Sequence, residues 1–270
     1  MRLGWRDLSL PGRGEQGRQW KKHVKTTICL IMDLDQINGL ELIRYTTSHP
    51  YDVSDQLIKV HGEAKKLSNH LHLPVQSGSN TVLERMLREY TVEHFLGLLE
   101  KLRKSNPKMV LSTDIIVGFV NETEEEFQDT LKLLDQAQFD SIFSYVYSER
   151  KNTRASKLTD NLPRELKSER LRYLQKYQLG IQEKIRRNLV GKTMRILVDG
   201  QSTMGGKKKW KGRTNCNRVV HFSSNRSDFD YKWNWVDLEI TSATALSCQG
   251  NFKNIYKKSK QNSKINSFPV

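Results

Sequence analysis

Cysteine is scarce in this sequence of 270 residues. Only Cys29, Cys216 and Cys248 are present, and no two of them have a CxxC or CxxxCxxC spacing. Such spacings place thiolates around one zinc ion or one iron–sulfur cluster. We therefore expect no metal site built from cysteines close together in this sequence. An odd number of unpaired cysteines also fits a reducing compartment.

Long apolar runs are missing as well. No segment approaches the roughly 18 apolar residues that a membrane-spanning helix needs. Residues 1–25 are rich in Gly, Arg and Lys and have no apolar core of the kind found in secretory signals. We therefore expect a cytoplasmic protein with no membrane partner, and a monomer.

Acidic residues are outnumbered. The chain has 45 Lys and Arg against 30 Asp and Glu, a formal charge of +15, and a pI of about 9.7. A surface this basic favours polyanions, and nucleic acid is the first candidate. The alternative is that the charge serves solubility alone.

The first part of the chain alternates between strand-like and helix-like patterns. Strands are predicted at residues 27–34, 39–50, 67–76, 109–119 and 140–148. Helices are predicted at residues 80–105, with a break near Tyr90 and a restart at the N-cap Thr91, and at residues 122–139. This order predicts an α/β fold with a parallel sheet of at least four strands, part of a barrel or a doubly wound sheet. Ligands bind such folds at the carboxyl ends of the strands.

The pattern changes after Pro163. A helix of about 26 residues is predicted there as a connector with a basic surface formed by Arg170, Arg172, Lys176, Lys184, Arg186 and Arg187. About five short strands follow in residues 191–255, which is typical of a small barrel of the oligonucleotide-binding kind. Cations beside an aromatic residue suit RNA, and the predicted contacts are Lys209, Trp210, Lys211, Arg213 and Arg218. The alternative for these lysines is protection of an edge strand.

Several long strings carry a resemblance to a known family. They are HLHLPVQSGSNTVLERMLREYT, LSTDIIVGFVNETEEEFQDTL, FDSIFSYVYSERKNTRA and GRTNCNRVVHF, in that order, with IRYTTSHP before them. Over about residues 39–255 the chain resembles the MiaB family of radical-SAM tRNA methylthiotransferases. The related ribosomal-protein methylthiotransferases are the main alternative within the superfamily.

The resemblance implies an architecture. Residues 1–35 would be a poorly ordered, non-matching N-terminus, and residues 36–188 a partial radical-SAM (β/α) barrel with its connector helix. Residues 189–255 would be a TRAM domain, a small OB-like RNA-binding barrel, and residues 256–270 a basic disordered tail. The cofactors would be S-adenosylmethionine and [4Fe-4S] clusters. The reaction would be methylthiolation at C2 of N6-isopentenyladenosine 37 of tRNA, with the anticodon stem-loop as partner.

The same motifs indicate where the cofactor would bind in this chain. The resemblance implies that S-adenosylmethionine contacts Gln76, Ser77, Gly78, Asp114, Ile116, Gly118, Ser148 and Arg150. A small Ser-Gly-Ser turn lets the backbone approach a ligand, and Gly118 would let the adenine pass closely. Arg150 would pair with a carboxylate or phosphate. The structural alternatives are an ordinary βα turn, strand packing and a surface ion pair. No catalytic residue and no metal ligand is assigned.

The chain departs from the family at the cluster. The N-terminal cluster domain and the CxxxCxxC loop are absent, so the cluster ligands are missing. Without thiolate ligands no cluster forms and no electron reaches the cofactor, which predicts an inactive chain. We expect a fragment of such an enzyme, and the alternative is a non-catalytic tRNA-binding remnant.

Overall fold

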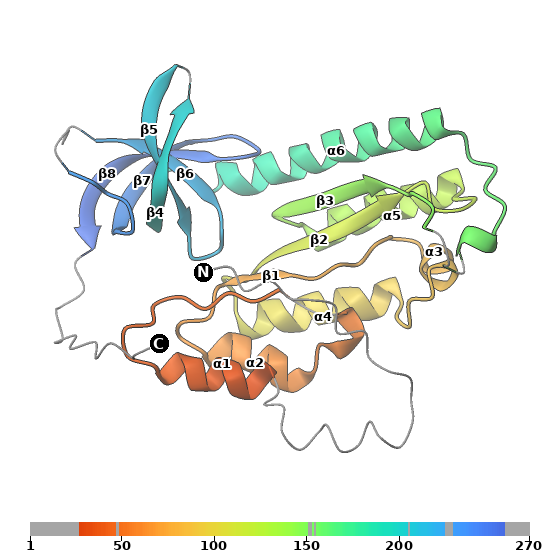
Figure 1. The fold of residues 1–270 in the computed structure, drawn as a ribbon, viewed down its shortest axis with the longest axis horizontal. Helices are drawn as coiled ribbons and strands as arrows, with labels where there is room; N and C mark the ends of the chain where they lie inside the picture. The colour runs from red at the N-terminus through yellow and green to blue at the C-terminus, as the bar shows by residue number, and fades with distance from the viewer. Residues whose placement is uncertain are drawn as a thin grey trace, which may run out of the picture.

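The computed structural model describes residues 27–46, 49–150, 153, 155–204, 206–224 and 229–256. They form two parts, a parallel α/β layer and a closed β-barrel (Figure 1). No helix among these residues has the length and apolar character needed to cross a membrane.

A three-stranded parallel sheet lies at the centre of the first part. Its order is β1 (His70–His72), β2 (Val110–Val117) and β3 (Ser141–Val146), with Leu71 opposite Leu111. One face is buried under three helices, α4 (Val92–Ser105), α5 (Glu124–Ala137) and α6 (Arg164–Arg187). Strand residues alternate between the two faces, so the opposite face carries the remaining side chains of each strand.

Local signals set the helix boundaries as the sequence predicted. A short helix, α3 (Asn80–Arg85), precedes α4, and the Thr91 hydroxyl accepts a hydrogen bond from the His94 amide to begin α4. Thr123 and Glu126 form a capping box at the start of α5. The two predicted helical regions and the break between α3 and α4 are therefore confirmed.

The start of the described chain differs from the prediction. Residues 27–36 form a helix, α1 (Thr27–Gln36), where a strand and, up to residue 35, poor order were expected. A short apolar run does not distinguish a buried helix from a strand by itself. Helical spacing decides here, because Ile31 is buried among Ile43, Leu57 and Val60.

The predicted strand at residues 39–50 is reduced to one bridge. Of the residues described in this range, only Ile43 pairs, with Leu67. The His49 side chain then caps a 3-10 turn, η3 (Pro50–Asp52). The next residue, Arg44, instead donates hydrogen bonds to backbone carbonyls of the second part. The parallel sheet in the described residues has three strands, so the expectation of at least four was wrong.

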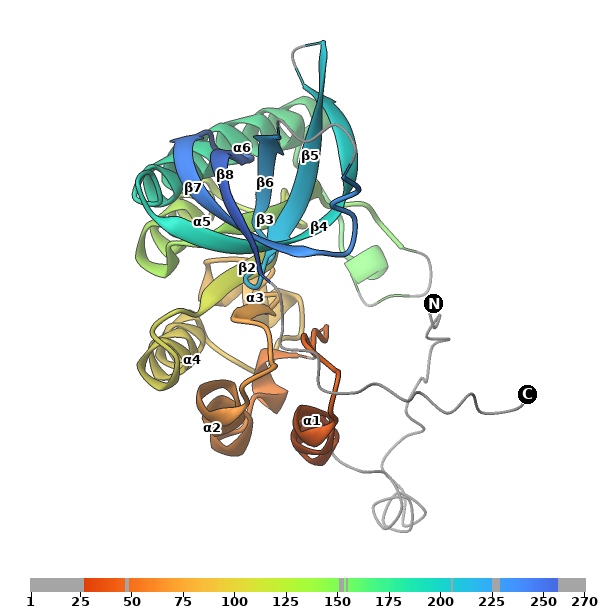
Figure 2. The same cartoon turned by 90° about the vertical axis from the view of Figure 1, so that its left-hand side faces the viewer.

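The helices follow the curve of an α/β barrel. In Figure 2, α5, α4, α2 (Asp55–Glu63) and α1 succeed one another along an arc outside the strands. Helices occupy this outer position in (β/α) barrels. The arrangement confirms an α/β fold with a parallel sheet and resembles one side of such a barrel.

Helix α6 is part of the α/β core. It packs on β3 and β2, and its Leu174 is fully buried. Arg170 and Arg186 are each 5% exposed and pair with Glu122 and Asp140, so they do not belong to a basic surface. The prediction of a basic connector was wrong for these two, because both face inward. The exposed cations of α6 are Arg164, Arg172, Lys176, Lys184 and Arg187.

The second part is the predicted five-stranded barrel. Its strands are β4 (Thr193–Met204), β5 (Lys207–Thr214), β6 (Val219–Ser223), β7 (Trp235–Ala243) and β8 (Cys248–Tyr256), closed in the order β4-β5-β6-β8-β7. Alternate residues such as Ile196, Val198 and Val236 fill the interior. Closure leaves no free edge in the barrel.

A polar junction joins the two parts. Asp140, which directly precedes β3, accepts hydrogen bonds from Arg186 of α6 and from Arg218 of the β5–β6 hairpin, 2.8 Å from the Arg218 Nε. In the same hairpin, the Asn215 side chain accepts from the Asn69 amide at 2.8 Å, and its carbonyl accepts from the Ser68 hydroxyl at 2.7 Å. The β5–β6 hairpin therefore packs against the amino-terminal edge of the sheet.

Candidate functional site

Gln76 stands at the carboxyl end of β1 in an unusual conformation. Its φ is 75°, a value that costs a residue other than glycine about 1–3 kcal/mol. The Gln76 amide donates to the Asp114 carbonyl at 2.9 Å, and its carbonyl accepts from the Ile116 amide at 2.8 Å. These two bonds to β2 hold the strained residue and aim its side chain beyond the strand end.

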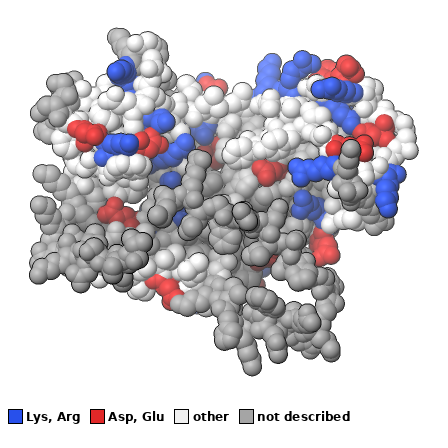
Figure 3. All heavy atoms as spheres, in the orientation of Figure 1, with Lys and Arg blue, Asp and Glu red and all other residues white. Residues whose placement is uncertain are grey.

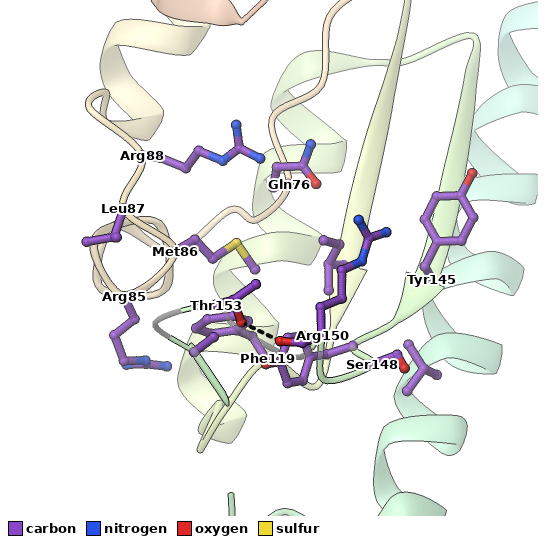
Figure 4. Close-up of a pocket in the computed structure, with 14 residues that line it drawn as sticks. Gln76, Arg85, Met86, Leu87, Arg88, Phe119, Tyr145, Ser148, Arg150 and Thr153 are labelled. Carbon is purple, nitrogen blue, oxygen red and sulfur yellow. Dashed lines mark hydrogen bonds between the residues drawn. The ribbon is translucent and has the colours of Figure 1, made fainter. Parts of the chain in front are cut away.

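A cavity of about 620 Å³ lies at this end of the sheet. Its volume falls in the range of small-molecule sites, about 300–1,000 Å³. In Figure 4, Gln76, Arg88 and Arg150 project toward its centre from three different segments. The cavity is lined also by Arg85, Met86, Leu87, Ile116, Phe119, Tyr145, Val146, Tyr147, Ser148, Thr153 and Ala155.

The cavity is cationic. Arg85 is turned to Glu126, with two 2.7 Å hydrogen bonds that lower the pKa of Glu126 to about 2. In the part of the chain that the structure describes, Arg88 and Arg150 have no carboxylate within ion-pair distance. Two guanidinium groups without anions suit a ligand that carries a carboxylate or a phosphate.

Tyr147 has an unsatisfied hydroxyl beside the cavity. Its Oη is buried and has no hydrogen-bond partner among the described residues, while its ring packs edge-on against Phe119 at 4.8 Å between centroids. Burial, with Glu149 and Asp160 nearby, raises the pKa of Tyr147. A buried polar group without a partner is costly, so this hydroxyl is suited to a ligand polar atom.

Four of the eight predicted cofactor residues meet at the cavity. Gln76, Ile116, Ser148 and Arg150 line it. The other four lie elsewhere. Asp114 faces His72 on the open side of the sheet, 3.3 Å away, and Gly118 donates its amide to Glu122 beneath Lys167 of α6.

The small turn after Gln76 packs on protein. The Gly78 amide donates to the Thr130 hydroxyl at 3.0 Å, and a Cβ on Gly78 would lie 2.4 Å from the Thr130 Cα. Ser77 is 1% exposed beside the same helix. The glycine is therefore required by close packing on α5, which agrees with the alternative of an ordinary βα turn. The contact of this turn with S-adenosylmethionine stays a prediction.

Sequence reasoning missed the residues that α3 and β3 supply. Arg88 and Leu87 follow the end of α3, where Leu87 has a φ of 58°. The helix break near Tyr90 was visible and could have identified this loop. Tyr145 of β3 was the other signal, because this large aromatic residue follows Ser144 at an outward-facing position of the strand. It is 54% exposed.

A polar row crosses the open face of the sheet. The Ser112 hydroxyl lies 2.9 Å from the His70 Nε2 and 2.9 Å from the His72 Nδ1, and His72 reaches Asp114. Burial lowers the pKa of His70 to about 4, so its imidazole is neutral at pH 7. None of these four residues lines the cavity.

The predicted RNA residues separate into three locations. Lys209, Lys211 and Arg213 alternate on the outer face of β5, while Trp210 packs inward against Tyr231 at 5.4 Å. Arg218 donates a hydrogen bond to Asp140 at the junction. Figure 3 shows Lys and Arg interspersed with Asp and Glu over this side of the molecule, so the cationic row of β5 is local.

A cluster does not fit the described residues. Cys29 is exposed, Cys216 partly exposed and Cys248 buried in the barrel, and none is in a disulfide. No group of three or more His, Cys, Asp or Glu side chains in the described ranges is arranged to hold a metal ion. S-adenosylmethionine fits better, because its carboxylate suits the two free guanidinium groups and its hydroxyls suit Gln76, Ser148 and Tyr147.

Comparison with known proteins identifies relatives. Residues 16–134 match the Radical SAM superfamily, a region that starts inside the segment expected not to match. A tRNA-2-methylthio-N(6)-dimethylallyladenosine synthase from Carboxydothermus hydrogenoformans is 42% identical over 221 residues, which are 82% of this chain and 49% of that protein. The protein of the same name from Acetivibrio thermocellus is 43% identical over 82% of this chain and 45% of its own length. The chain thus spans about half the length of the curated relatives it matches.

One solved structure is more distant. Coproporphyrinogen III oxidase from Escherichia coli, described as a radical SAM enzyme, is 16% identical, with a TM-score of 0.42 over 71% of this chain and 45% of that chain.

Proposed function

Because this chain belongs to the radical-SAM tRNA methylthiotransferase family, we propose that it provides the S-adenosylmethionine pocket and the RNA-binding barrel of a tRNA-2-methylthio-N6-dimethylallyladenosine synthase. The observation that carries the proposal is the cavity at the carboxyl ends of β1, β2 and β3, where Gln76 and Arg150 meet. The substrate would be N6-isopentenyladenosine 37 in the anticodon stem-loop of tRNA. The barrel would be the TRAM domain that holds this RNA.

The residues of the cavity have distinct roles in this proposal. Arg150 and Arg88 bind the carboxylate of S-adenosylmethionine, and Gln76 orients a polar group through its side-chain amide. Phe119 and Ile116 exclude water from the adenosine. When bound, S-adenosylmethionine supplies the methyl group of the product. The cluster ligands are not among the described residues, so no radical step is assigned to this part of the chain.

Calorimetric titration of the chain with S-adenosylmethionine tests the pocket. Arg150→Ala is expected to weaken binding about tenfold or more, the loss of one charge-assisted contact. Arg172→Ala, on the exposed side of α6, is the matched control and should leave the Kd unchanged. Equal affinities of wild type and Arg150→Ala would contradict the assignment.

A second function is favoured by the absence of cluster ligands from the described residues. A chain that binds tRNA without chemistry would use the same barrel and the same β5 cations. Reconstitution with iron and sulfide distinguishes the two. A chain that serves only as an RNA-binding module shows no cluster absorbance and forms no 5′-deoxyadenosine, yet binds tRNA in a salt-dependent way.

A further inference from the structure

A cleft of about 420 Å³ separates the outer face of the barrel from the α/β part. The barrel contributes Arg195, Trp235 and Tyr256, and the α/β part contributes Lys65 and Lys66 from the segment after α2. The cleft shares none of its lining residues with the cavity at the strand ends. It lies between the two parts on the side where β7 and β8 approach the loop after α1.

Two aromatic rings form one wall of the cleft. Trp235 of β7 is directly opposite Tyr256 of β8 in the strand register, and both point outward because their neighbours Val236 and Ile255 pack against the core. Tyr256 is 42% exposed. Aromatic faces of this kind are platforms on which unpaired bases stack.

The rings are held in place at their edges. The Trp235 Nε1 donates to the Glu41 Oε2 at 2.6 Å, so the indole is anchored across the cleft and its face is left for stacking. The Arg195 guanidinium lies 3.6 Å from the Tyr256 ring centroid and is fixed by Asp237, 2.8 Å from its Nε. A platform that is already ordered loses little entropy on binding.

The opposite wall is cationic. The amides of Lys65 and Lys66 donate to the Asp35 carboxylate, at 3.3 and 2.7 Å, which fixes the backbone of this segment. Neither lysine side chain has an ion-pair partner in the residues that the structure describes. The Lys66 Nζ donates to the Ile37 carbonyl at 2.6 Å, so Lys65 carries the ammonium group that is available to a ligand. An ordered aromatic wall facing this ammonium group complements a base and its phosphate.

The cleft is continuous with the cationic row of β5. Trp235 is opposite Leu197 of β4, and Leu197 is opposite Arg213 of β5, so these side chains follow one another across the outer face of the barrel. Lys211 and Lys209 extend the row beyond Arg213 along the same strand. A strand of RNA whose phosphates follow β5 would thus be led to the cleft.

From this arrangement we propose that the cleft binds an unpaired nucleotide of RNA, with its base on Trp235 and its phosphate beside Lys65. The proposal rests on the proposed function for its RNA partner and adds a second contact site on that RNA. Duplex RNA is excluded from the cleft, because its bases are stacked on one another and unavailable to an aromatic wall.

Fluorescence anisotropy of the full chain with a labelled ten-nucleotide oligoadenylate tests this site. Trp235→Ala is expected to raise the Kd about tenfold, the loss typical of one base–aromatic stack. Affinity for an RNA duplex of the same length should stay unchanged. Trp233→Ala is the matched control, since Trp233 is 68% exposed on the neighbouring turn and does not line the cleft.

A second variant keeps the test valid if Trp235→Ala does not fold. Lys65 is exposed, so Lys65→Gln preserves the fold and is expected to reduce the slope of log K against log salt by about 0.7 for the oligonucleotide. Lys59→Gln on α2 removes the same charge outside the cleft and should leave the slope unchanged.

The outcomes separate this proposal from the proposed function. If the wild-type chain binds the oligonucleotide and tRNA, but neither Trp235→Ala nor Lys65→Gln alters binding, the cleft assignment is overturned and the proposed function stands. If the wild-type chain binds no RNA, both are overturned. Binding of an acidic peptide in place of RNA, abolished by Trp235→Ala, would also overturn the nucleotide assignment.

Discussion

At the residue scale, Gln76 combines a strained backbone with a side chain in the cavity. Both Gln76→Gly and Gln76→Ala remove the side chain, but only glycine adopts a φ of 75° without cost. We expect Gln76→Gly to be more stable than Gln76→Ala by about 1 kcal/mol in urea unfolding. Both variants should weaken binding of S-adenosylmethionine.

Gln138 provides a control for that comparison. It has a φ of 48° at the C-cap of α5 and does not line the cavity. The same preference for glycine over alanine is expected there, with cofactor binding unchanged. An alanine variant of Gln76 as stable as the glycine variant would show that the backbone is relaxed.

Glu126 gives a prediction about pH at the same scale. The two hydrogen bonds from Arg85 hold the pKa of Glu126 at about 2, below its ordinary value of 4.5. A lowered pKa stabilises the fold above pH 4.5, and this contribution disappears as the pH falls toward 2. Glu126→Gln should reduce the free energy of unfolding by about 1–2 kcal/mol at pH 7.

The difference between wild type and Glu126→Gln should shrink steadily between pH 4.5 and pH 2, as followed by urea unfolding at each pH. Glu100→Gln on α4 is the control, because Glu100 is exposed and its side chain has no hydrogen-bond or ion-pair partner among the described residues. A difference that does not change with pH would mean that the Arg85 contact contributes through packing alone.

At the element scale, the loop after β1 and helix α5 are fitted to each other at Gly78. A Cβ there would meet the Thr130 Cα at 2.4 Å and the Asp129 carbonyl at 2.6 Å, both backbone groups that move only with the helix. Gly78→Ala is expected to lower the free energy of unfolding by about 2–3 kcal/mol. Because the loop also positions Gln76, cofactor affinity should fall as well.

Gly97 provides the control in a helix. Its Cβ would meet nothing within 4 Å on α4, so Gly97→Ala should raise the free energy of unfolding by about 0.5–1 kcal/mol. Urea unfolding of the two variants measures both effects. A Gly78→Ala variant as stable as wild type would show that α5 is free to shift.

Elements with strong local signals were predictable from sequence, and elements defined by distant partners were not. The capping box at Thr123 and the N-cap at Thr91 fixed the starts of α5 and α4. The run at residues 27–34 has no such signal, and only its burial against Ile43 and Val60 makes it helical. Likewise, the carboxyl ends of the parallel strands predicted where the cavity lies. Arg88 reaches the cavity from a loop in which Leu87 is left-handed, and no sequence pattern indicates that conformation.

The same limit applies to the barrel. Alternation in β5 predicts that Lys209 and Lys211 share a face, but it does not say that Trp210 is inside. The role of Arg218 depends on Asp140, which lies far away in the sequence. A charge pattern therefore identifies a basic strand, and the tertiary partner decides which cations remain available to RNA.

At the scale of the whole molecule, the buried carboxylate of Asp140 connects the two parts. Asp140 is 7% exposed and receives hydrogen bonds from Arg218 of the barrel and Arg186 of α6. In the part of the chain that the structure describes, the Nε and Nη1 of Arg186 are buried without hydrogen-bond partners, so Asp140 is the carboxylate that balances the charge of this guanidinium. Removing one partner of a buried ion pair leaves the other charge uncompensated, which costs about 3–5 kcal/mol.

Asp140→Ala is therefore expected to lower the free energy of unfolding by about that amount and to uncouple the two parts. The described tryptophans, Trp210, Trp233 and Trp235, all belong to the barrel part, while the described helices all belong to the α/β part. The chain also has Trp5 and Trp20, which lie outside the described residues. In a background with Trp5→Phe and Trp20→Phe, tryptophan fluorescence and far-ultraviolet circular dichroism thus report different parts during urea unfolding. The two transitions should coincide in the wild type and separate in Asp140→Ala.

Asp129→Ala is the control for this variant, because the Asp129–Lys132 pair is exposed on α5 and worth at most about 1 kcal/mol. Coincident transitions in Asp140→Ala, with a loss as small as that of Asp129→Ala, would contradict the role of Asp140. The junction would then be held by the hairpin contacts of Asn215 with Ser68 and Asn69. Separated transitions would instead show that a single buried carboxylate makes the pocket and the RNA-binding barrel one cooperative unit.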